Sequence, residues 1–241
     1  MIHWSKKPSS PSLDLLVFGA HPDDAELMCS GTLTLLSKTK KVGVIDITEA
    51  ELSTNGTAEQ RVLETQNATK IMNLDARGNL KRKDGQLYLD HDLTEILTKV
   101  LRECQPKVII GPPDNCRHPD HQALHENLNR AVFYCGLKKF CPETPSITRP
   151  QYYQYLEVQN QTPDFCIDIT SVWDEKVKAI QAYQSQFENT NETSKTFINS
   201  GFIESLEQRF KQAGKDSGVE YAEPFLSSKL LCFKKPEEQL F

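Results

Sequence analysis

Short apolar runs alternate with amphipathic runs along the 241-residue chain. The runs LDLLVFGA, VGVIDIT and KVIIG are apolar or β-branched, which is typical of buried parallel strands. Residues 92–103 carry apolar side chains at the spacing of one buried helix face. Thr57 and Gln60 match a capping box, which predicts a helix from about Ala58 to Met72. The predicted strands are 13–20, 42–48, 107–111, 151–158 and 165–169, and the predicted helices are 25–37, 58–72, 92–103, 124–134 and 173–187.

This alternation, with short connections, predicts an α/β fold with a Rossmann-like, mainly parallel sheet and helices on both faces. No shift in composition marks a domain boundary, so we expect a single domain over residues 13–233. We expect a flexible leader at residues 1–12 and a solvated tail at 234–241. The polar stretch 189–200 is expected to form a mobile loop.

Composition and charge narrow the possible partners. The 28 Lys and Arg against 33 Asp and Glu give a formal net charge of −5, which argues against a general nucleic-acid binder. No run reaches the roughly 18 apolar residues of a membrane span, and the polar first residues lack the core of a secretory signal. We therefore expect a cytoplasmic protein whose seven Cys remain thiols.

Two motifs rich in His and Asp follow two of the predicted strands. AHPDD, which contains His21, Asp23 and Asp24, comes directly after the first strand, and HPDH, from His118 to His121, comes after the strand 107–111. Ligand sites of open parallel sheets lie beyond the carboxyl ends of the strands, so both motifs should share one rim. Either motif alone would be typical of a turn, because Pro fixes φ and Asp caps helices. Two such motifs at two strand ends favour a functional site.

These residue types suit zinc-assisted hydrolysis. A catalytic zinc takes three protein ligands and leaves one position for water, and two imidazoles with one carboxylate are a common set. In the doublet Asp23-Asp24, one carboxylate could bind the metal while the other takes a proton from the water. The second motif has one His to spare for the oxyanion. No G-x-S-x-G, Walker A or H-E-x-x-H motif occurs, which argues against several other hydrolase and nucleotide-binding classes.

The AHPDD and HPDH motifs resemble those of the PIG-L/LmbE family of zinc-dependent N-acetylglucosamine deacetylases, over most of the chain. Four further segments are similar to the branch that deacetylates N-acetylglucosaminyl-malate in bacillithiol biosynthesis. The resemblance implies an LmbE-like fold, a small sugar conjugate as substrate and a homo-oligomeric assembly, without a nucleic-acid or membrane partner. The four segments are TEAELSTNGTAEQR (48–61), CRHPDH (116–121), AYQSQF (182–187) and YAEPF (221–225).

The resemblance also implies a role for each motif residue. Asp23 would be the general base, and His118 would be the imidazolium that stabilises the oxyanion, with Asp120 beside it to orient and charge it. Whether Asp23 or His118 protonates the leaving amine stays open at this point. Fe(II) could replace zinc, since nitrogen and oxygen sites of this kind accept it. The implied metal ligands are His21, Asp24 and His121.

Two arginines, Arg61 and Arg117, are candidates for binding the carboxylates of the substrate. A malate group carries two carboxylates, which the guanidinium fork matches in geometry, although either side chain could instead form a surface ion pair. Related enzymes are thought to contact the tetrahedral intermediate through a tyrosine, and the nearest position here is Phe202. His125 is expected on a helix surface, and Cys116 is expected to be a small buried thiol. The alternatives to this function are the same chemistry on another N-acetyl sugar or thiol conjugate, and a non-catalytic carbohydrate-binding protein.

Overall fold

The computed structural model describes residues 2–156, 161–187 and 200–232, which build one eight-stranded sheet in the order β1-β4-β3-β2-β5-β6-β8-β7. The strands are β1 (His3–Lys6), β2 (Leu15–Gly19), β3 (Val42–Thr48), β4 (Ala76–Arg82), β5 (Val108–Gly111), β6 (Gln151–Tyr155), β7 (Phe165–Asp168) and β8 (Ala222–Ser227). The helices are α1 (Asp24–Ser37), α2 (Ala58–Ile71), α3 (His91–Cys104), α4 (Pro119–Tyr134), α5 (Trp173–Gln181), α6 (Gln184–Phe187) and α7 (Ser200–Ser217), and a 3-10 turn (Thr170–Val172) precedes α5.

The direction of the strands creates a crevice at the centre of the sheet. The neighbouring strands β4, β3, β2, β5 and β6 run parallel, whereas β1 is antiparallel to β4, and β8 is antiparallel to both β6 and β7. From β2 the chain proceeds outward through β3 to β4, and then returns to place β5 on the other side of β2. Such a reversal leaves a crevice beyond the carboxyl ends of the two central strands.

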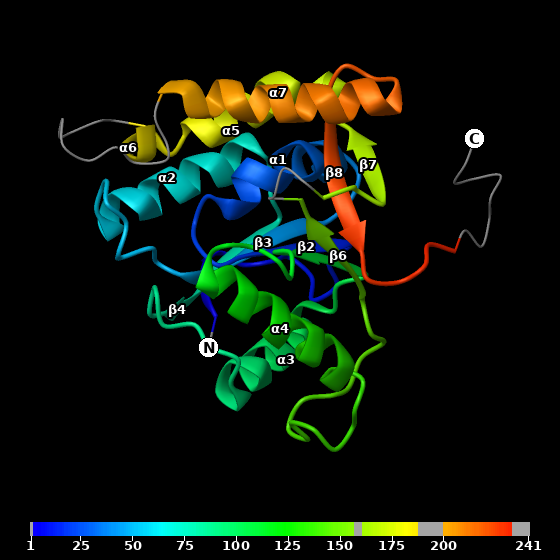
Figure 1. The fold of residues 1–241 in the computed structure, drawn as a ribbon. Helices are drawn as coiled ribbons and strands as arrows, with labels where there is room; N and C mark the ends of the chain where they lie inside the picture. The colour runs from blue at the N-terminus through cyan, green and yellow to red at the C-terminus, as the bar shows by residue number, and fades with distance from the viewer. Residues whose placement is uncertain (1, 157–160, 188–199, 233–241) are drawn as a thin grey trace.

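Helices cover both faces of the sheet (Figure 1). α3 and α4 lie on one face, and α1, α2, α5 and α7 lie on the other. The alternation of side chains along β2 supplies both cores, since Leu16 and Phe18 face α3 and α4, whereas Leu15 and Val17 face α1. This arrangement confirms the predicted α/β fold with a mainly parallel sheet.

The structure corrects several expected elements. Residues 3–6, expected in a flexible leader, pair with β4 as strand β1. β4 and β8 were not predicted, because their sequences ARGNLKR and AEPFLS carry polar or Pro residues. The helix expected at 173–187 is divided into α5 and α6. The expected tail 234–241 and residues 189–199 of the expected loop lie outside the described residues.

α4 begins earlier than residue 124, the expected start. His118 caps its first turn, and Pro119 occupies the first helical position. A backbone N–H at this position has no partner within the helix, so proline loses no hydrogen bond there. The HPDH motif therefore lies on the first turn of a helix rather than in a loop before it. This places His121 on a rigid element.

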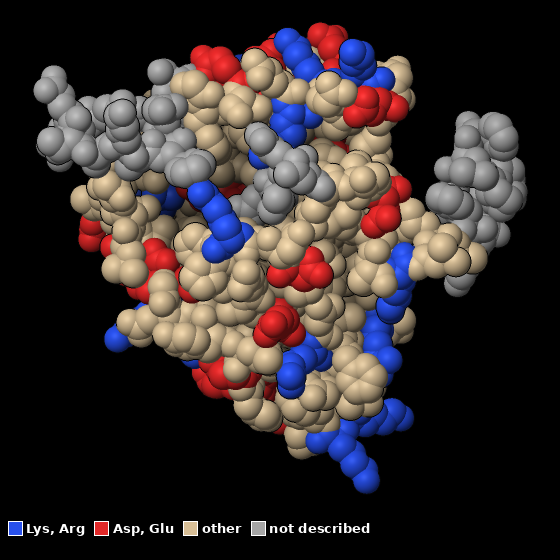
Figure 2. All heavy atoms as spheres, viewed as in Figure 1, with Lys and Arg blue, Asp and Glu red and all other residues tan. Residues whose placement is uncertain are grey.

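The described residues contain no helix long and apolar enough to cross a membrane, and no disulfide joins the cysteines among them. On the face shown in Figure 2, Lys and Arg side chains are interspersed with Asp and Glu, so that neither sign covers the face. This distribution agrees with the small net charge of −5.

Candidate active site

The two motifs meet beyond the ends of β2 and β5, which are paired neighbours in the sheet. The first motif connects β2 to α1, and the second begins α4 after β5. This confirms that both motifs lie on the same rim of the sheet. The ring centroids of His21 and His118 are 4.8 Å apart, and those of His118 and His121 are 4.9 Å apart.

The first motif folds into a tight and strained turn. Asp23 has φ 123° and ψ −24°, a positive φ that side chains with a Cβ rarely adopt, and it directly precedes α1. Asp24 Oδ2 accepts a hydrogen bond from the backbone N–H of His21 at 2.9 Å. A Cβ on Gly19 would lie 2.9 Å from the carbonyl oxygen of His21, so the close approach of the turn to β2 requires glycine.

Three donor atoms of the predicted metal ligands converge in this crevice. Asp24 Oδ2 lies 3.3 Å from His121 Nε2 and 3.7 Å from His21 Nδ1, and the two nitrogen atoms are 3.4 Å apart. An ion held tetrahedrally at about 2.1 Å from each donor would separate the donors by about 3.4 Å. The three residues His21, Asp24 and His121 therefore fit a zinc ion, and His118 supplies a further imidazole nitrogen within 4.8 Å of those of His21 and His121.

The electrostatics of these groups agree with a cation site. Burial alone would lower the pKa of His21, but the carboxylates of Asp120, Asp24 and Asp84 together hold it well above its ordinary value. Burial opposes ionisation of Asp24, yet the imidazoles of His121 and His21 hold the pKa of this carboxyl well below its ordinary value. The crevice is thus rich in negative charge around its imidazoles.

Asp23, the expected base, lies beside this crevice and contacts Arg61. Burial raises the pKa of Asp23 to about 7, and the guanidinium of Arg61 opposes this rise. Nη1 of Arg61 donates to Asp23 Oδ2 at 3.0 Å and to the carbonyl oxygen of Pro22 at 2.7 Å, and its Nη2 donates to Ser53 Oγ at 3.0 Å. Arg61 is only 4% exposed, so it is not a surface side chain.

His118 caps α4 through its ring. Its Nδ1 accepts the backbone N–H of Asp120 at 3.3 Å, so a neutral ring carries its proton on Nε2. Burial lowers the pKa of His118, and the neighbouring His21 and His121 lower it further. This lowered pKa favours a neutral His118 over the imidazolium that the family resemblance implies.

Asp120 has partners beyond its own motif. Its two carboxylate oxygens accept the backbone N–H groups of Gly85 at 2.8 Å and Leu87 at 3.3 Å, and Oδ2 also lies 3.6 Å from His21 Nε2. Asp84, which the sequence did not single out, lies closer, with Oδ1 at 2.9 Å from the same nitrogen. The only sequence signal for Asp84 is an Asp-Gly turn, which says nothing about its distant partner.

Two neighbouring residues differ in how well the sequence predicted them. Cys116 is a buried thiol, as expected, and its Sγ lies 3.4 Å from His121 Nδ1. His125 is buried rather than on a helix surface: its Nδ1 lies 3.0 Å from the carbonyl oxygen of Pro112 and 3.2 Å from the hydroxyl of Tyr152. His125 thus belongs to the packing between α4 and the sheet.

The crevice opens into a cavity of about 1140 Å³. Arg61 of α2, Arg117 before α4 and Arg209 of α7 line it. Arg117 is exposed at this cavity, as its place before the HPDH motif predicts. Arg209 could not be predicted, because α7 was not.

The same cavity has an apolar wall. Leu27 and Met28 of α1 and Phe202 and Leu206 of α7 line it. Phe202, the position considered for a tyrosine, therefore does lie at the cavity, but its ring offers no hydroxyl.

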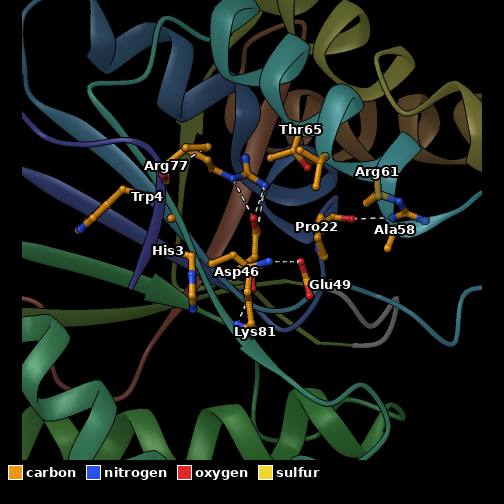
Figure 3. A pocket seen from close by; sticks show the side chains of 14 residues that line it. His3, Trp4, Pro22, Asp46, Glu49, Ala58, Arg61, Thr65, Arg77 and Lys81 are labelled. Atoms are coloured by element: carbon orange, nitrogen blue, oxygen red, sulfur yellow. Dashed lines mark hydrogen bonds and ion pairs between the residues drawn. The ribbon is translucent and has the colours of Figure 1, made fainter. Parts of the chain in front are cut away.

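A second, smaller cavity of about 200 Å³ is lined by Pro22 and also by Arg61 (Figure 3). Arg77 of β4 lines it and forms a two-pronged ion pair with Asp46 of β3, with hydrogen bonds of 2.8 and 2.9 Å. Arg77 also contacts Glu26 in the first turn of α1. This buried network ties β3 and β4 to the helix that begins at Asp24.

The comparisons with known proteins agree with this geometry. The family model described as PIG-L, GlcNAc-PI de-N-acetylase, matches residues 16–132, which contain both motifs. The conserved protein TT1542 from Thermus thermophilus has 33% sequence identity, and the match covers 92% of this chain and 97% of that one with a TM-score of 0.84. The chain belongs to the PIG-L family.

Two more distant relatives are named for different reactions. A diacetylchitobiose deacetylase from Thermococcus kodakarensis is 23% identical over 75% of this chain and 73% of its own. The 4-carboxy-2-hydroxymuconate hydratase GalB from Pseudomonas putida KT2440 is 21% identical, over 93% of this chain and 98% of that one, with a TM-score of 0.74. Because a hydratase shares the fold, the reaction has to be argued from the site.

Proposed function

We propose that this PIG-L protein is a zinc-dependent N-deacetylase that removes the acetyl group of N-acetylglucosaminyl-L-malate, giving glucosaminyl-malate and acetate in bacillithiol biosynthesis. The observation that carries the proposal is the convergence of His21 Nδ1, Asp24 Oδ2 and His121 Nε2 within 3.3 to 3.7 Å, with Asp23 beside them. The deacetylase from Thermococcus kodakarensis supports the reaction type, and the four segments similar to the bacillithiol branch support the substrate.

His21, Asp24 and His121 would hold the zinc ion, and Fe(II) suits the same nitrogen and oxygen donors. When bound, the metal would supply Lewis acidity to the amide carbonyl and to the attacking water. Asp23 accepts the proton of that water and passes it to the nitrogen of the leaving glucosamine, so that no proton is gained or lost over the reaction. Its pKa of about 7 suits both roles near neutral pH.

His118 stabilises the developing oxyanion as a neutral donor. Because Nδ1 already accepts the N–H of Asp120, the Nε2–H of a neutral ring is the group left to donate. Asp120 adds negative charge to this group of imidazoles and holds the turn at Gly85 and Leu87 through its two oxygens. A donor aimed at the position of the oxyanion typically contributes about 3 to 4 kcal/mol to the transition state.

Arginines bind the carboxylates of the malate group in this proposal. Arg117 is exposed at the cavity and Arg209 lines it from α7. Arg61 lines the same cavity, but three of its hydrogen bonds go to protein groups, so binding a substrate carboxylate would compete with Asp23. A cytoplasmic location, expected from the sequence, and a homo-oligomeric assembly, implied by the family resemblance, remain predictions.

Acetate release tests the proposal directly. The zinc-loaded protein should release acetate from N-acetylglucosaminyl-malate with a higher kcat/KM than from N-acetylglucosamine or diacetylchitobiose. Asp23→Ala should abolish turnover and retain zinc, whereas His21→Ala should lose the metal. A higher kcat/KM for diacetylchitobiose would replace the substrate with another N-acetyl sugar. Binding of these sugars without acetate release would make the protein a non-catalytic carbohydrate-binding protein.

A further inference from the structure

Asp84 contacts a metal-binding histidine from a distant part of the chain. It lies on the turn after β4, and its side chain is buried, with Oδ1 at 2.9 Å from His21 Nε2. The two residues are 63 positions apart in the sequence. Asp84 therefore contacts the ring nitrogen of His21 that is not one of the three converging donor atoms.

The two ring nitrogens of His21 face different partners. Nδ1 points to Asp24 and His121, whereas Nε2 points to Asp84. A neutral imidazole has one N–H and one lone pair, and a carboxylate accepts only the N–H. With the proton on Nε2, the lone pair of Nδ1 is directed to the metal position.

We propose that Asp84 is a positioning residue that fixes the tautomer and the ring orientation of His21 for metal binding. The proposal rests on the proposed function only in taking His21 as a metal ligand. Carboxylates that accept the second N–H of a metal-bound histidine hold its ring in place, and removing one typically weakens metal binding by about 10- to 100-fold.

The turn that carries Asp84 is itself fixed at several points. Asp84 Oδ2 accepts the backbone N–H of Leu52 at 3.1 Å, and the backbone N–H of Asp84 donates to Glu51 Oε1 at 2.8 Å. Gly85 has φ +68°, and its N–H donates to Asp120. Asp84 is thus held in place before any metal binds.

Asp84 is better placed for this role than Asp120, the other carboxylate near His21 Nε2. Asp120 Oδ2 is 3.6 Å from that nitrogen, beyond hydrogen-bonding distance, and it already accepts the N–H of Gly85 at 2.8 Å. Asp84 has one oxygen for His21 and the other for Leu52. An asparagine at this position has a single oxygen for these two donors, so Asp84→Asn loses one bond or weakens the one to His21, because hydrogen bonds to a neutral acceptor are weaker.

The affinity for Zn²⁺ tests the proposal without substrate. The full chain is stripped of metal and titrated with Zn²⁺ against a chromophoric chelator, for the unmutated protein, Asp84→Asn, Asp84→Ala and the control Glu49→Gln. Glu49 carries the same charge nearby but pairs with Lys81 at 2.8 Å. We expect Asp84→Asn and Asp84→Ala to weaken Zn²⁺ binding by about 10- to 100-fold, and the control by less than about twofold.

A spectroscopic readout separates positioning from general destabilisation. In ¹H–¹⁵N spectra of the zinc-loaded protein, the Nε2–H of His21 should be protected from exchange, and Asp84→Asn, which is nearly isosteric, should remove that protection. The proposal would be overturned if Asp84→Asn bound Zn²⁺ with an affinity within twofold of the unmutated protein and left the Nε2–H signal unchanged. If the unmutated protein releases no acetate but Asp84→Asn still weakens Zn²⁺ binding, the proposed function is wrong and this inference holds.

Discussion

Replacing Arg61 with alanine distinguishes two roles that the cavity allows for this side chain. The sequence predicts that Arg61 binds a substrate carboxylate, whereas the structure shows its guanidinium on Asp23, Pro22 and Ser53. If Arg61 acts on Asp23, its loss impairs the chemical step for every substrate. If it acts on the substrate, its loss weakens the binding of carboxylate-bearing substrates alone.

The size of the effect follows from the contacts. Asp23 is held at φ 123°, a conformation that costs about 1 to 3 kcal/mol and persists only where the surroundings enforce it. Hydrogen bonds to a charged group contribute about 1.5 to 3 kcal/mol each, and Arg61 supplies one to the Asp23 carboxylate and one to the preceding carbonyl oxygen. Losing about 3 kcal/mol of this restraint, if it appears in the barrier, lowers kcat by about 100-fold.

Acetate release is measured for Arg61→Ala with N-acetylglucosaminyl-malate and with the uncharged N-acetylglucosamine. We expect kcat to fall by a similar factor for both substrates, with Zn²⁺ affinity retained. Arg117→Ala is the matched control, since this exposed arginine lines the same cavity, and it should raise KM for the malate conjugate only. A loss in Arg61→Ala that is confined to the KM of the malate conjugate would refute the restraint of Asp23.

Three further predictions concern the metal and the fold. Removing metal with a chelator should abolish acetate release, restored by Zn²⁺, with the far-ultraviolet circular dichroism unchanged; turnover of a protein verified to be metal-free would contradict this. Lys176→Met should lower the free energy of unfolding in urea by about 3 to 5 kcal/mol, because it leaves Glu223 charged and buried, and a loss below about 1 kcal/mol would count against it. Gly19→Ala should weaken Zn²⁺ binding by about tenfold or more, as its Cβ would meet the His21 carbonyl at 2.9 Å, and unchanged affinity would show that the turn can shift freely.

The sequence predicted those parts of the fold whose burial is visible in the local pattern of apolar residues. β2, β3 and β5 are buried on both faces, so they appear as continuous apolar runs. β4 was missed because Arg77 interrupts its pattern, although this side chain is almost fully buried between Asp46 and Glu26. When a charged residue is neutralised by partners far away in the sequence, the pattern of its own segment wrongly predicts that it is exposed.

In the site, too, features that follow from local patterns could be predicted and contacts between distant segments could not. The convergence of the two motifs could be predicted because parallel strands end at one edge of a sheet. The contacts of His21 with Asp84 and of Asp23 with Arg61 could not, because each depends on how a turn or helix far along the chain returns to the motif. The tautomer of His118, with its proton on Nε2 when the ring is neutral, likewise depends on the backbone N–H of Asp120, which only the structure places.

We interpret the buried ion pairs around α1 as contacts that fix the position of this helix. Glu223 accepts the N–H groups of Gly31 and Thr32 at 2.8 Å each, and Lys176 lies 2.8 Å from the same carboxylate. One oxygen of Glu26, Oε2, has no hydrogen-bond partner among the described residues, so the pair that it forms with Arg77 is poorly compensated for its loss of water. Apolar side chains would fill such a core at less cost, but they would not fix the rotation and translation of α1. Because α1 begins at Asp24, the same contacts that are unfavourable in the core hold the Asp24 carboxylate, a proposed metal ligand, in register with His21 and His121.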